Sequence, residues 1–579
     1  MTDIEQNNSH NDMTEKSYLI ADVGTTNTTV TLFDVALGSY RLLACATAPT
    51  TMAEPWLDIS QGIRQAVQQI SAVTGRRLFN KRGDIIRPMR QDGTGVDLFT
   101  AVFSAPSLLR TMIVGLSEDV SLHAAQLVLA ANYTDVVGQF DPSDNRHKGK
   151  QLQVFLEANP DLVLIAGGVD GGASTRLLEL LDIVRLGMKL MEEATKPTII
   201  FAGNKALREQ LTTIFGSETA VHIADNIHPT LTQQNLDNAI ALVSEQYQSQ
   251  KIRPLPGMRE VIDWSQLPFQ PTAHAFAAII QYFAALHRGN VLGIDLGSSK
   301  VALVSVVNDK TSITVRSDLG MGHTAVNCLT VVSPADINRW LPDPISEDEI
   351  INWVQNKVLY PQTIPTSEKA VSLEYAIARE MIRQAADQPL SLEANVPAFR
   401  LLVAHGATLT NAPSIGHAVL TLLDALEPTG IFSVLIDKQG VLPALGTIAP
   451  HDPLVVVQSL ENGALLNAGW VIAPVGKTTL GQKAVTVTIE LPDERPLQVN
   501  VEYGGIERIP LAPGKSAKVT IKPERRFDIG FGYGKKKTVT LFGGMLGIVI
   551  DARGRPINLK RKKTTVHQLV QQWLQVLGD

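Results

Sequence analysis

The chain has 579 residues, and because a single hydrophobic core stops growing at about 250–300 residues, we expect several domains. A hydrophobic fraction of 44% and a charged fraction of 19% are typical of a globular protein and exclude a disordered chain. The net charge of −6 argues against a nucleic-acid-binding protein, and only two cysteines, Cys45 and Cys328, exclude a disulfide framework. No segment approaches the roughly 18–20 apolar residues of a membrane span, so we expect a soluble, cytoplasmic protein.

Polar and basic segments are concentrated near the two ends of the chain. Residues 1–16 are mostly polar and are predicted to form a disordered tail. Two basic runs lie near the other end, at Lys535–Lys537 and Lys560–Lys563. We interpret both runs as solvated loops, because no aromatic platform is interleaved with them.

The ordered chain begins with IADVGTTNTTVTLFD, in which an apolar strand, a small polar turn and a second strand follow one another. A third strand is expected at Arg41–Thr47, and apolar residues recur at helical spacing in Leu57–Val73. In the turn, Gly24 allows close approach of the backbone to a phosphate, whereas Asp22 requires a divalent cation between itself and the phosphate. We predict a first lobe over residues 17–105, although such a turn alone also fits a plain hairpin.

From Thr111 onwards, strands rich in β-branched residues alternate strictly with amphipathic helical segments. This alternation predicts βαβ crossovers, a parallel sheet and therefore an inserted α/β domain at residues 106–230. The loop Gly167–Gly172 follows a buried strand and is either a structural crossover turn or a surface that faces a partner. A helical connector is expected over residues 231–290.

The stretch Val291–Val306 (VLGIDLGSSKVALVSV) repeats the first motif, since Asp22 aligns with Asp295 and Gly24 with Gly297. Two copies, each opening a separate half of the chain, predict two related lobes that face each other across a cleft. The backbone N–H groups and hydroxyls of each turn can donate hydrogen bonds to phosphate oxygens.

A third element, RLLVAHGATLTNAP at Arg400–Pro413, reads as a buried strand, a turn containing Gly406, and a helix. A purine and ribose could lie against the backbone of this turn. We predict a second lobe over residues 291–452. Short alternating stretches then predict a β sandwich or barrel with a short closing helix over residues 453–579.

The order of two phosphate loops and an adenosine turn resembles the actin, sugar kinase and heat-shock ATPase superfamily. Several long stretches are similar to the glutamate mutase L family, the accessory proteins of cobalamin-dependent glutamate mutase. They are IADVGTTNTTVTLFD, TMIVGLSEDVSLHAAQ, LVLIAGGVDGG, IIFAGN, ADNIHP, GIDLGSSKVALVS, VAHGATLTNAP, LDALEPTGIFSVLIDKQGVLPALG and GGMLGIVIDARGRPI. The implied fold is an α/β, actin-like duplicated core related to ribonuclease H, with an inserted Rossmann-like α/β domain and a C-terminal β-rich domain.

The resemblance also implies a function, namely ATP-dependent maintenance or reactivation of a cobalamin-dependent mutase. ATP or ADP with Mg²⁺ would be the cofactor, a mutase subunit would be the partner, and a homo-oligomer is left open. Asp22 and Asp295 would be the catalytic and metal-binding residues. The residues expected to contact the nucleotide are Gly24, Thr25, Thr26 and Asn27 in the first loop, Gly297, Ser298, Ser299 and Lys300 in the second, and Gly406 and Ala407 in the adenosine turn.

The sequence departs from the family pattern in the second loop and in the adenosine turn. Ser298 replaces a glycine, Ala302 stands where an acid is usual, and His405 replaces the first glycine of a pair. Lys300, in place of a threonine, is either a phosphate ligand or a surface strand residue. Hydrolysis is therefore expected to be weak or absent. His323, His405 and His417 show no metal spacing and are expected to be structural or surface residues.

Two other functions are weighed against the accessory ATPase. In the first, the protein is a scaffold that binds nucleotide without hydrolysing it, which the altered second loop and the added β module favour. In the second, it is a small-molecule kinase, ranked last because no carboxylate is evident as the base. Cobalamin binding by this chain is not predicted, because Asp144–Gly149 has the wrong spacing for a lower-ligand motif.

Overall fold

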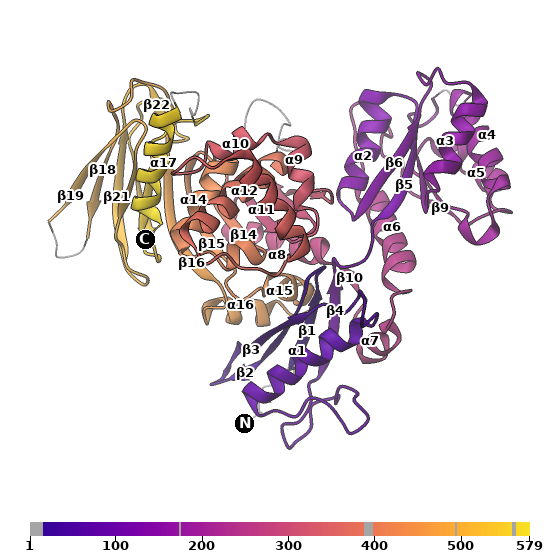
Figure 1. Cartoon of the computed structure of the whole chain (residues 1–579), viewed down its shortest axis with the longest axis horizontal. Helices are drawn as coiled ribbons and strands as arrows, with labels where there is room; N and C mark the ends of the chain where they lie inside the picture. Colours follow the sequence, from indigo (N-terminus) through magenta and orange to yellow (C-terminus); the bar gives the residue numbers. More distant parts are fainter. Residues whose placement is uncertain (1–15, 173–174, 387–397, 492–494, 558–562, 579) are drawn as a thin grey trace, which may run out of the picture.

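The computed structural model describes residues 16–172, 175–386, 398–491, 495–557 and 563–578. Two lobes are stacked at the centre of the molecule, with residues of the predicted insert on one side and the C-terminal strands on the other (Figure 1). The predicted tail, apart from Lys16, lies outside the described residues. Among the described helices, none is both long and apolar enough to cross a membrane.

The first lobe is built on a five-stranded sheet in the order β10-β4-β1-β2-β3. Strands β1, β2 and β3 form an antiparallel meander, and β4 lies parallel to β1. The strands are β1 (Tyr18–Val23), β2 (Asn27–Ala36), β3 (Ser39–Pro49), β4 (Leu98–Phe103) and β10 (Gln270–Pro271). One face is covered by α1 (Ile59–Thr74), which begins where the Asp58 side chain accepts a hydrogen bond from the Ser60 N–H, and ends at Gly75 in the left-handed region.

The second lobe repeats this arrangement within an eight-stranded sheet in the order β13-β12-β11-β14-β15-β16-β24-β20. Its first three strands again form a meander, and the fourth strand, β14, lies parallel to β11. The strands are β11 (Val291–Leu296), β12 (Val301–Val307), β13 (Lys310–Arg316), β14 (Leu401–His405), β15 (Gly430–Ile436), β16 (Leu466–Ala473), β20 (Ile506–Ile509) and β24 (Ile548–Asp551). The repeated strand order confirms the predicted fold class, an α/β protein with an actin-like duplicated core.

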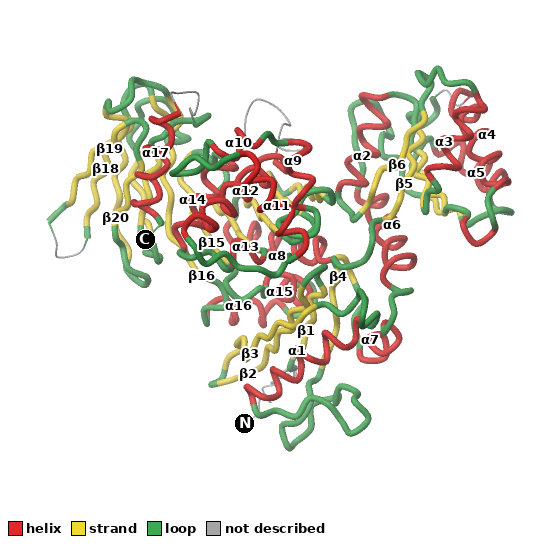
Figure 2. The backbone as a smooth tube through the Cα atoms, in the orientation of Figure 1, coloured by secondary structure: helices red, strands yellow, loops and turns green. Residues whose placement is uncertain are grey.

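Helices fill the space between the two sheets and cover their outer faces (Figure 2). Because side chains alternate along a strand, Leu19 packs towards α1, whereas Tyr18 and Ile20 pack towards α8 (Thr272–His287) and α15 (Leu442–Ile448). These two helices touch closely, since a Cβ at Gly446 would lie 1.8 Å from the Ala275 carbonyl oxygen. The outer face of the second sheet is covered by α11 (Glu347–Leu359), α12 (Glu368–Ala386) and α14 (Ile415–Leu426).

The residues of the predicted insert form a parallel sheet in the order β6-β5-β7-β8-β9. Helices α2 (His123–Ala130), α3 (Lys148–Ala158), α4 (Thr175–Leu190) and α5 (Arg208–Phe215) accompany these strands. The strands are β5 (Leu109–Val114), β6 (Thr134–Phe140), β7 (Leu162–Ile165), β8 (Thr198–Phe201) and β9 (Val221–Ile223). Part of this sheet shares one hydrophobic cluster with the first lobe, so the two are joined by a continuous core. Residues 106–230 as a separate domain stay a prediction.

The connector expected at residues 231–290 does more than link the lobes. It contains α6 (Asp237–Tyr247) and α7 (Met258–Trp264), then β10, which joins the first sheet, and α8, which lies between the lobes. The apolar residues around α8 are explained by burial on both sides of the helix.

Most C-terminal strands form small sheets of their own, whereas β20 and β24 join the second-lobe sheet. A four-stranded sheet of β18 (Lys483–Glu490), β19 (Leu497–Glu502), β21 (Ser516–Pro523) and β23 (Lys537–Phe542) packs against the far end of the second-lobe sheet. Beyond the predicted boundary at residue 453, β16 still belongs to the second lobe, because it pairs with β15. The helix before it, α16 (Pro453–Glu461), lies against β3 of the first lobe, where the Tyr40 N–H donates to Gln458 Oε1. Strands β20 and β24, which come much later in the chain, are also part of the second-lobe sheet, and the predicted domain bounds stay a prediction.

A buried ion network ties this region to the second lobe. Arg553 pairs with Asp424 on α14 and, at 2.8 Å, with Asp551 at the end of β24. Asp424 also accepts from Arg379 on α12. Although burial opposes ionisation, Arg553 and Arg555 hold the pKa of Asp551 well below its usual range. The segment Asp551–Pro556 is thus held to the second lobe by this buried ion network.

Candidate functional site

A cavity of about 670 Å³ opens between the two lobes. Its walls come from the β1–β2 turn, the β11–β12 turn and the segment after β14. The structure brings together every predicted site residue in this lining, namely Asp22, Gly24, Thr25, Thr26, Asn27, Asp295, Gly297, Ser298, Ser299, Lys300, Gly406 and Ala407. Their roles towards a ligand stay predictions.

The two aspartate-bearing turns have the same backbone geometry. The Gly24 N–H donates to the Asn27 carbonyl oxygen at 3.0 Å, and the Gly297 N–H donates to the Lys300 carbonyl oxygen at 2.9 Å. A Cβ would lie 2.9 Å from that acceptor at Gly24 and 3.0 Å from it at Gly297. Both glycines are therefore required by the tight hairpin itself, in addition to any role in approaching a ligand.

Hydroxyl groups join the two turns across the cleft. Thr26 Oγ1 donates to Ser298 Oγ at 2.7 Å, and Ser299 Oγ donates to Thr25 Oγ1 at 3.1 Å. Four hydroxyls that can each donate to an anion therefore meet at one place, where the lobes approach each other. The side chain of Ser298 takes part in this contact between the lobes.

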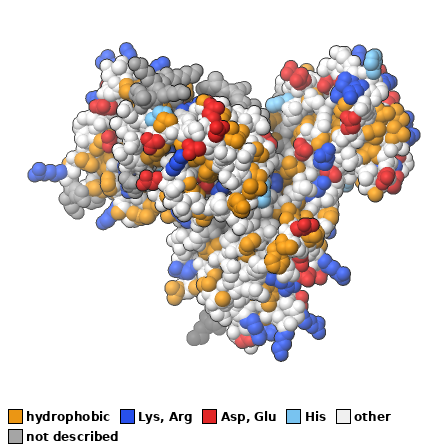
Figure 3. Space-filling model, viewed as in Figure 1, with side chains coloured by type: hydrophobic (Ala, Val, Ile, Leu, Met, Phe, Trp, Pro, Cys, Tyr) orange, Lys and Arg blue, Asp and Glu red, His pale blue; other side chains and the backbone are white. Residues whose placement is uncertain are grey.

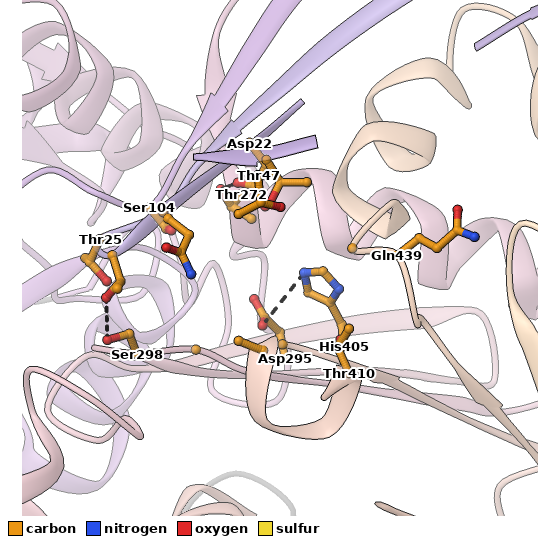
Figure 4. A pocket seen from close by; sticks show the side chains of 18 of the residues that line it. Asp22, Thr25, Thr47, Ser104, Thr272, Asp295, Ser298, His405, Thr410 and Gln439 are labelled. Atoms are coloured by element: carbon orange, nitrogen blue, oxygen red, sulfur yellow. Dashed lines mark hydrogen bonds and ion pairs between the residues drawn. The ribbon is translucent and has the colours of Figure 1, made fainter. Parts of the chain in front are cut away.

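The two aspartates face the cavity from opposite lobes (Figure 4). Asp22 accepts from Thr272 Oγ1 at 2.9 Å, and burial raises its pKa to about 6. Burial likewise raises the pKa of Asp295. Across the described residues, no group of three or more His, Cys, Asp and Glu side chains forms a ready-made metal cage. A cation here would need oxygen ligands from another source as well.

His405 lines the cavity and is buried, which excludes the surface alternative and is compatible with a structural role. Its Nδ1 lies 2.9 Å from an Asp437 carboxylate oxygen, and its Nε2 lies 4.0 Å from Asp295, towards which the ring points in Figure 4. Although burial alone would lower the pKa of His405, Asp295 and Asp437 raise it to about 9. The imidazole is thus a cation at neutral pH, and its charge offsets that of neighbouring carboxylates.

Lys300 also lies in the cleft and is not a surface strand residue. Its Nζ donates to the Ser104 carbonyl oxygen at 2.5 Å and lies 5.0 Å from the centre of the Tyr133 ring. Burial lowers the pKa of Lys300 to about 8, so Lys300 is still protonated in most molecules at neutral pH. Ala302, where an acid was expected, lines the same cavity and pairs with Asp295 across the two strands.

Several further residues of the site escaped the sequence analysis. Thr272 at the start of α8 and Tyr133 in the segment between α2 and β6 line the cavity, and Asp437 anchors His405. A signal for Asp437 exists, because it follows β15 directly, as Asp22 and Asp295 lie near the ends of β1 and β11. Thr272 and Tyr133 carry no such signal, because only the packing of distant elements brings them to the cleft.

Two facing lobes with the same strand order, each with an aspartate at the mouth of a shared cavity, define an actin-like protein. A model of the family described as MutL protein matches residues 18–463. Because this match spans more than half of the chain, the chain belongs to the MutL protein family. The curated relative Protein MutL of Clostridium tetanomorphum is 21% identical over 387 residues, which cover 63% of this chain and 76% of the relative.

Two solved structures align with most of the chain at 10–11% identity. The nucleotide-free structure of acetone carboxylase, described as an ATP-dependent enzyme, aligns with a TM-score of 0.32 and 10% identity over 84% of this chain and 81% of that chain. Diol dehydratase-reactivating factor in nucleotide-free form aligns with a TM-score of 0.29 and 11% identity over 75% of this chain and 99% of that chain. Family membership rests on the family model.

Proposed function

We propose that the cleft binds ATP or ADP with Mg²⁺ and that the protein is an accessory protein that maintains or reactivates a cobalamin-dependent mutase. The observation that carries the proposal is the meeting of two hairpin turns of equal geometry at one cavity. Thr25, Thr26, Ser298 and Ser299 would donate to the phosphates, as would the backbone N–H groups of the turns. Gly406 and Ala407 would lie against the nucleoside.

The donor set fits a hydrated magnesium ion. Asp22 and Asp295 supply carboxylates, and Mg²⁺ is commonly held by one or two carboxylates together with waters and phosphate oxygens. The raised pKa of Asp22 also fits, because a buried carboxylate without a cation is destabilised in its charged form. When bound, the ion would neutralise charge on the phosphate oxygens.

We propose that hydrolysis is slow, because of the residues that line the cavity. Ala302 offers no carboxylate to orient a water, and His405, held as a cation between two aspartates, is a poor proton acceptor. Lys300 would place a positive charge near the phosphates and favour binding more than turnover. We propose that nucleotide acts chiefly by setting the angle between the lobes.

The alternative is a scaffold that binds nucleotide without turnover and without a mutase partner. One observation favours it, namely the replacement of the expected acid by Ala302. A small-molecule kinase is ranked third. Such an enzyme needs a further carboxylate as the catalytic base, and among the described residues only Asp22 and Asp295 supply carboxylates to the cavity lining.

A reconstitution separates these functions. Purified protein is mixed with a cobalamin-dependent mutase that has been inactivated with its damaged cofactor bound, in the presence of ATP and free intact cofactor. The accessory function predicts recovery of mutase activity that requires the protein and is lost in Asp22→Ala. Nucleotide binding without any recovery would favour the scaffold, and turnover on the order of 10 per second without a partner would favour the kinase.

A further inference from the structure

A basic and aromatic loop projects from the C-terminal strands, far from the cleft. We call residues 525–537 the basic aromatic loop; its sequence is RRFDIGFGYGKKK. It contains β22 (Phe527–Asp528), which pairs with β17 (Val475–Gly476) and lies at the upper left in Figure 1. Figure 3 shows Lys and Arg side chains at this end of the molecule.

The backbone of the loop is held in one conformation. The Asp528 carboxylate accepts from the N–H groups of Gly530, Phe531 and Gly532 at 2.8–3.0 Å. The Gly534 N–H donates to the Phe527 carbonyl oxygen at 2.8 Å, and Gly530, Gly532 and Gly534 all have positive φ. These contacts pre-organise the loop, so little conformational entropy would be lost on binding.

The loop buries two of its apolar side chains and exposes the other two. Phe527 and Ile529 are each 1% exposed and pack into the core of the C-terminal strands. Phe531 is 45% exposed and Tyr533 is 66% exposed. Two large rings on a fixed, solvated loop are unusual for a plain connecting turn, because solvated loops rarely hold aromatic residues in place.

The charge of the loop is not neutralised by its surroundings. Arg525, Arg526, Lys535 and Lys536 are exposed, and no described residue forms an ion pair with any of them or with Lys537. The nearby acid Glu524 pairs with Lys483 at 2.8 Å, and Asp528 Oδ1 accepts from the backbone N–H groups of Gly530, Phe531 and Gly532. The loop is therefore a cationic patch on a chain with a net charge of −6.

The two ends of the loop are also brought together. A Cβ at Gly534 would lie 3.2 Å from the Arg525 Cα, so the arginine pair and the lysine run are neighbours. The Lys537 Nζ lies 4.4 Å from the centre of the Phe531 ring. The interpretation of Lys535–Lys537 as a solvated loop took no account of Phe531 and Tyr533, which come shortly before the lysines in the sequence.

We propose that the basic aromatic loop is a docking surface for an acidic segment of a partner protein. Arginine and aromatic residues are enriched in protein interfaces. The positive charge of the arginine and lysine side chains in the loop is complementary to carboxylates. Insertion of the loop into a bilayer is disfavoured, because Lys537 holds a charge over the Phe531 ring. Single-stranded nucleic acid is also disfavoured, since it needs a track of cations, whereas on the adjacent sheet Lys518 is already paired with Glu490.

The probe is a fluorescein-labelled 12-residue peptide of alternating glutamate and tyrosine, and the measurement is fluorescence anisotropy with the full-length protein. We expect binding that weakens about five- to tenfold in Lys535→Gln/Lys536→Gln, because two exposed charge pairs are lost. Phe531→Ser/Tyr533→Ser should weaken it by more than about tenfold, as for truncated aromatic anchors. The matched control, Lys310→Gln/Lys515→Gln, removes the same charge at exposed positions elsewhere and should leave the affinity unchanged.

Other outcomes overturn the proposal. Equal losses in the control would mean that the peptide senses only overall charge, and no binding by the wild type at millimolar peptide would remove the surface altogether. Tighter binding of a 20-residue oligo-dT, or of vesicles containing phosphatidylserine, with loss in the loop variants, would assign the loop to nucleic acid or membrane instead. The inference does not depend on the proposed nucleotide site. The thermal stabilisation by nucleotide, measured in the same variants, reports on that site separately.

Discussion

Asp22 should destabilise the ligand-free protein, and Asp22→Asn should therefore stabilise it. Burial raises the pKa of this carboxyl from 3.8 to about 6. A buried carboxyl group whose pKa is raised on folding contributes no penalty below its unfolded pKa and the full penalty above its folded pKa. At 1.36 kcal/mol for each pKa unit, the penalty at pH 7.5 is about 3 kcal/mol, falling to about 1 kcal/mol at pH 4.5. Asparagine keeps an oxygen that can accept from Thr272 and carries no charge.

The assay is chemical or thermal unfolding of both proteins, without nucleotide or divalent ions, at pH 4.5 and pH 7.5. We expect the variant to be more stable at pH 7.5, with the advantage shrinking at pH 4.5. The same variant should lose its stabilisation by Mg²⁺ and ADP, because the carboxylate is needed when the ion is present. A variant less stable than the wild type at pH 7.5, or an advantage independent of pH, would refute the view that Asp22 is a buried charge kept for function.

Three further outcomes are expected. The pKa of His405 rises from 6.5 to about 9, so its stabilising contribution is complete below pH 6.5 and disappears as the pH rises through 9. Unfolding measured across this pH range should show a loss of about 3 kcal/mol in the free energy of unfolding, and His405→Asn should not show this loss. Gly24→Ala should cost about 1–3 kcal/mol in thermal unfolding, whereas Gly149→Ala, where an added Cβ meets nothing within 4 Å, should cost nothing. Arg553→Met should lower the free energy of unfolding in denaturant by about 3–5 kcal/mol, because Asp551 and Asp424 are left buried without that cation. A loss below about 1 kcal/mol would show that the buried ion network is dispensable for stability.

The parts of the fold that follow from local pattern could be predicted from the sequence. Short local sequence patterns predict the two hairpins around Asp22 and Asp295, and they also predict the alternation of strands and helices in the insert. The end of the second lobe could not be found in this way. The strand β16 has an ordinary strand pattern, and only its hydrogen bonds to β15 assign it to the second-lobe sheet.

The site was predictable where each residue lies in a recognisable turn. The position of His405 in the cavity wall could not be predicted, because its two carboxylate partners come from elements that are distant in the sequence. The alternatives for Lys300 could not be separated, because its position in the cleft depends on contacts with Ser104 and Tyr133 of another part of the chain. Electrostatic environments of this kind are properties of the packed fold and leave no local trace in the sequence.

The central claim is that the cleft between the lobes binds a magnesium nucleotide, and isothermal titration of the purified full-length chain with ADP in the presence of Mg²⁺ tests it most directly. The account predicts one site per chain, loss of binding in Asp22→Ala, and weaker but measurable binding in Lys300→Ala. Equal loss in both variants would make Lys300 a primary phosphate ligand. The absence of binding heat and of any thermal stabilisation by millimolar nucleotide would contradict the claim.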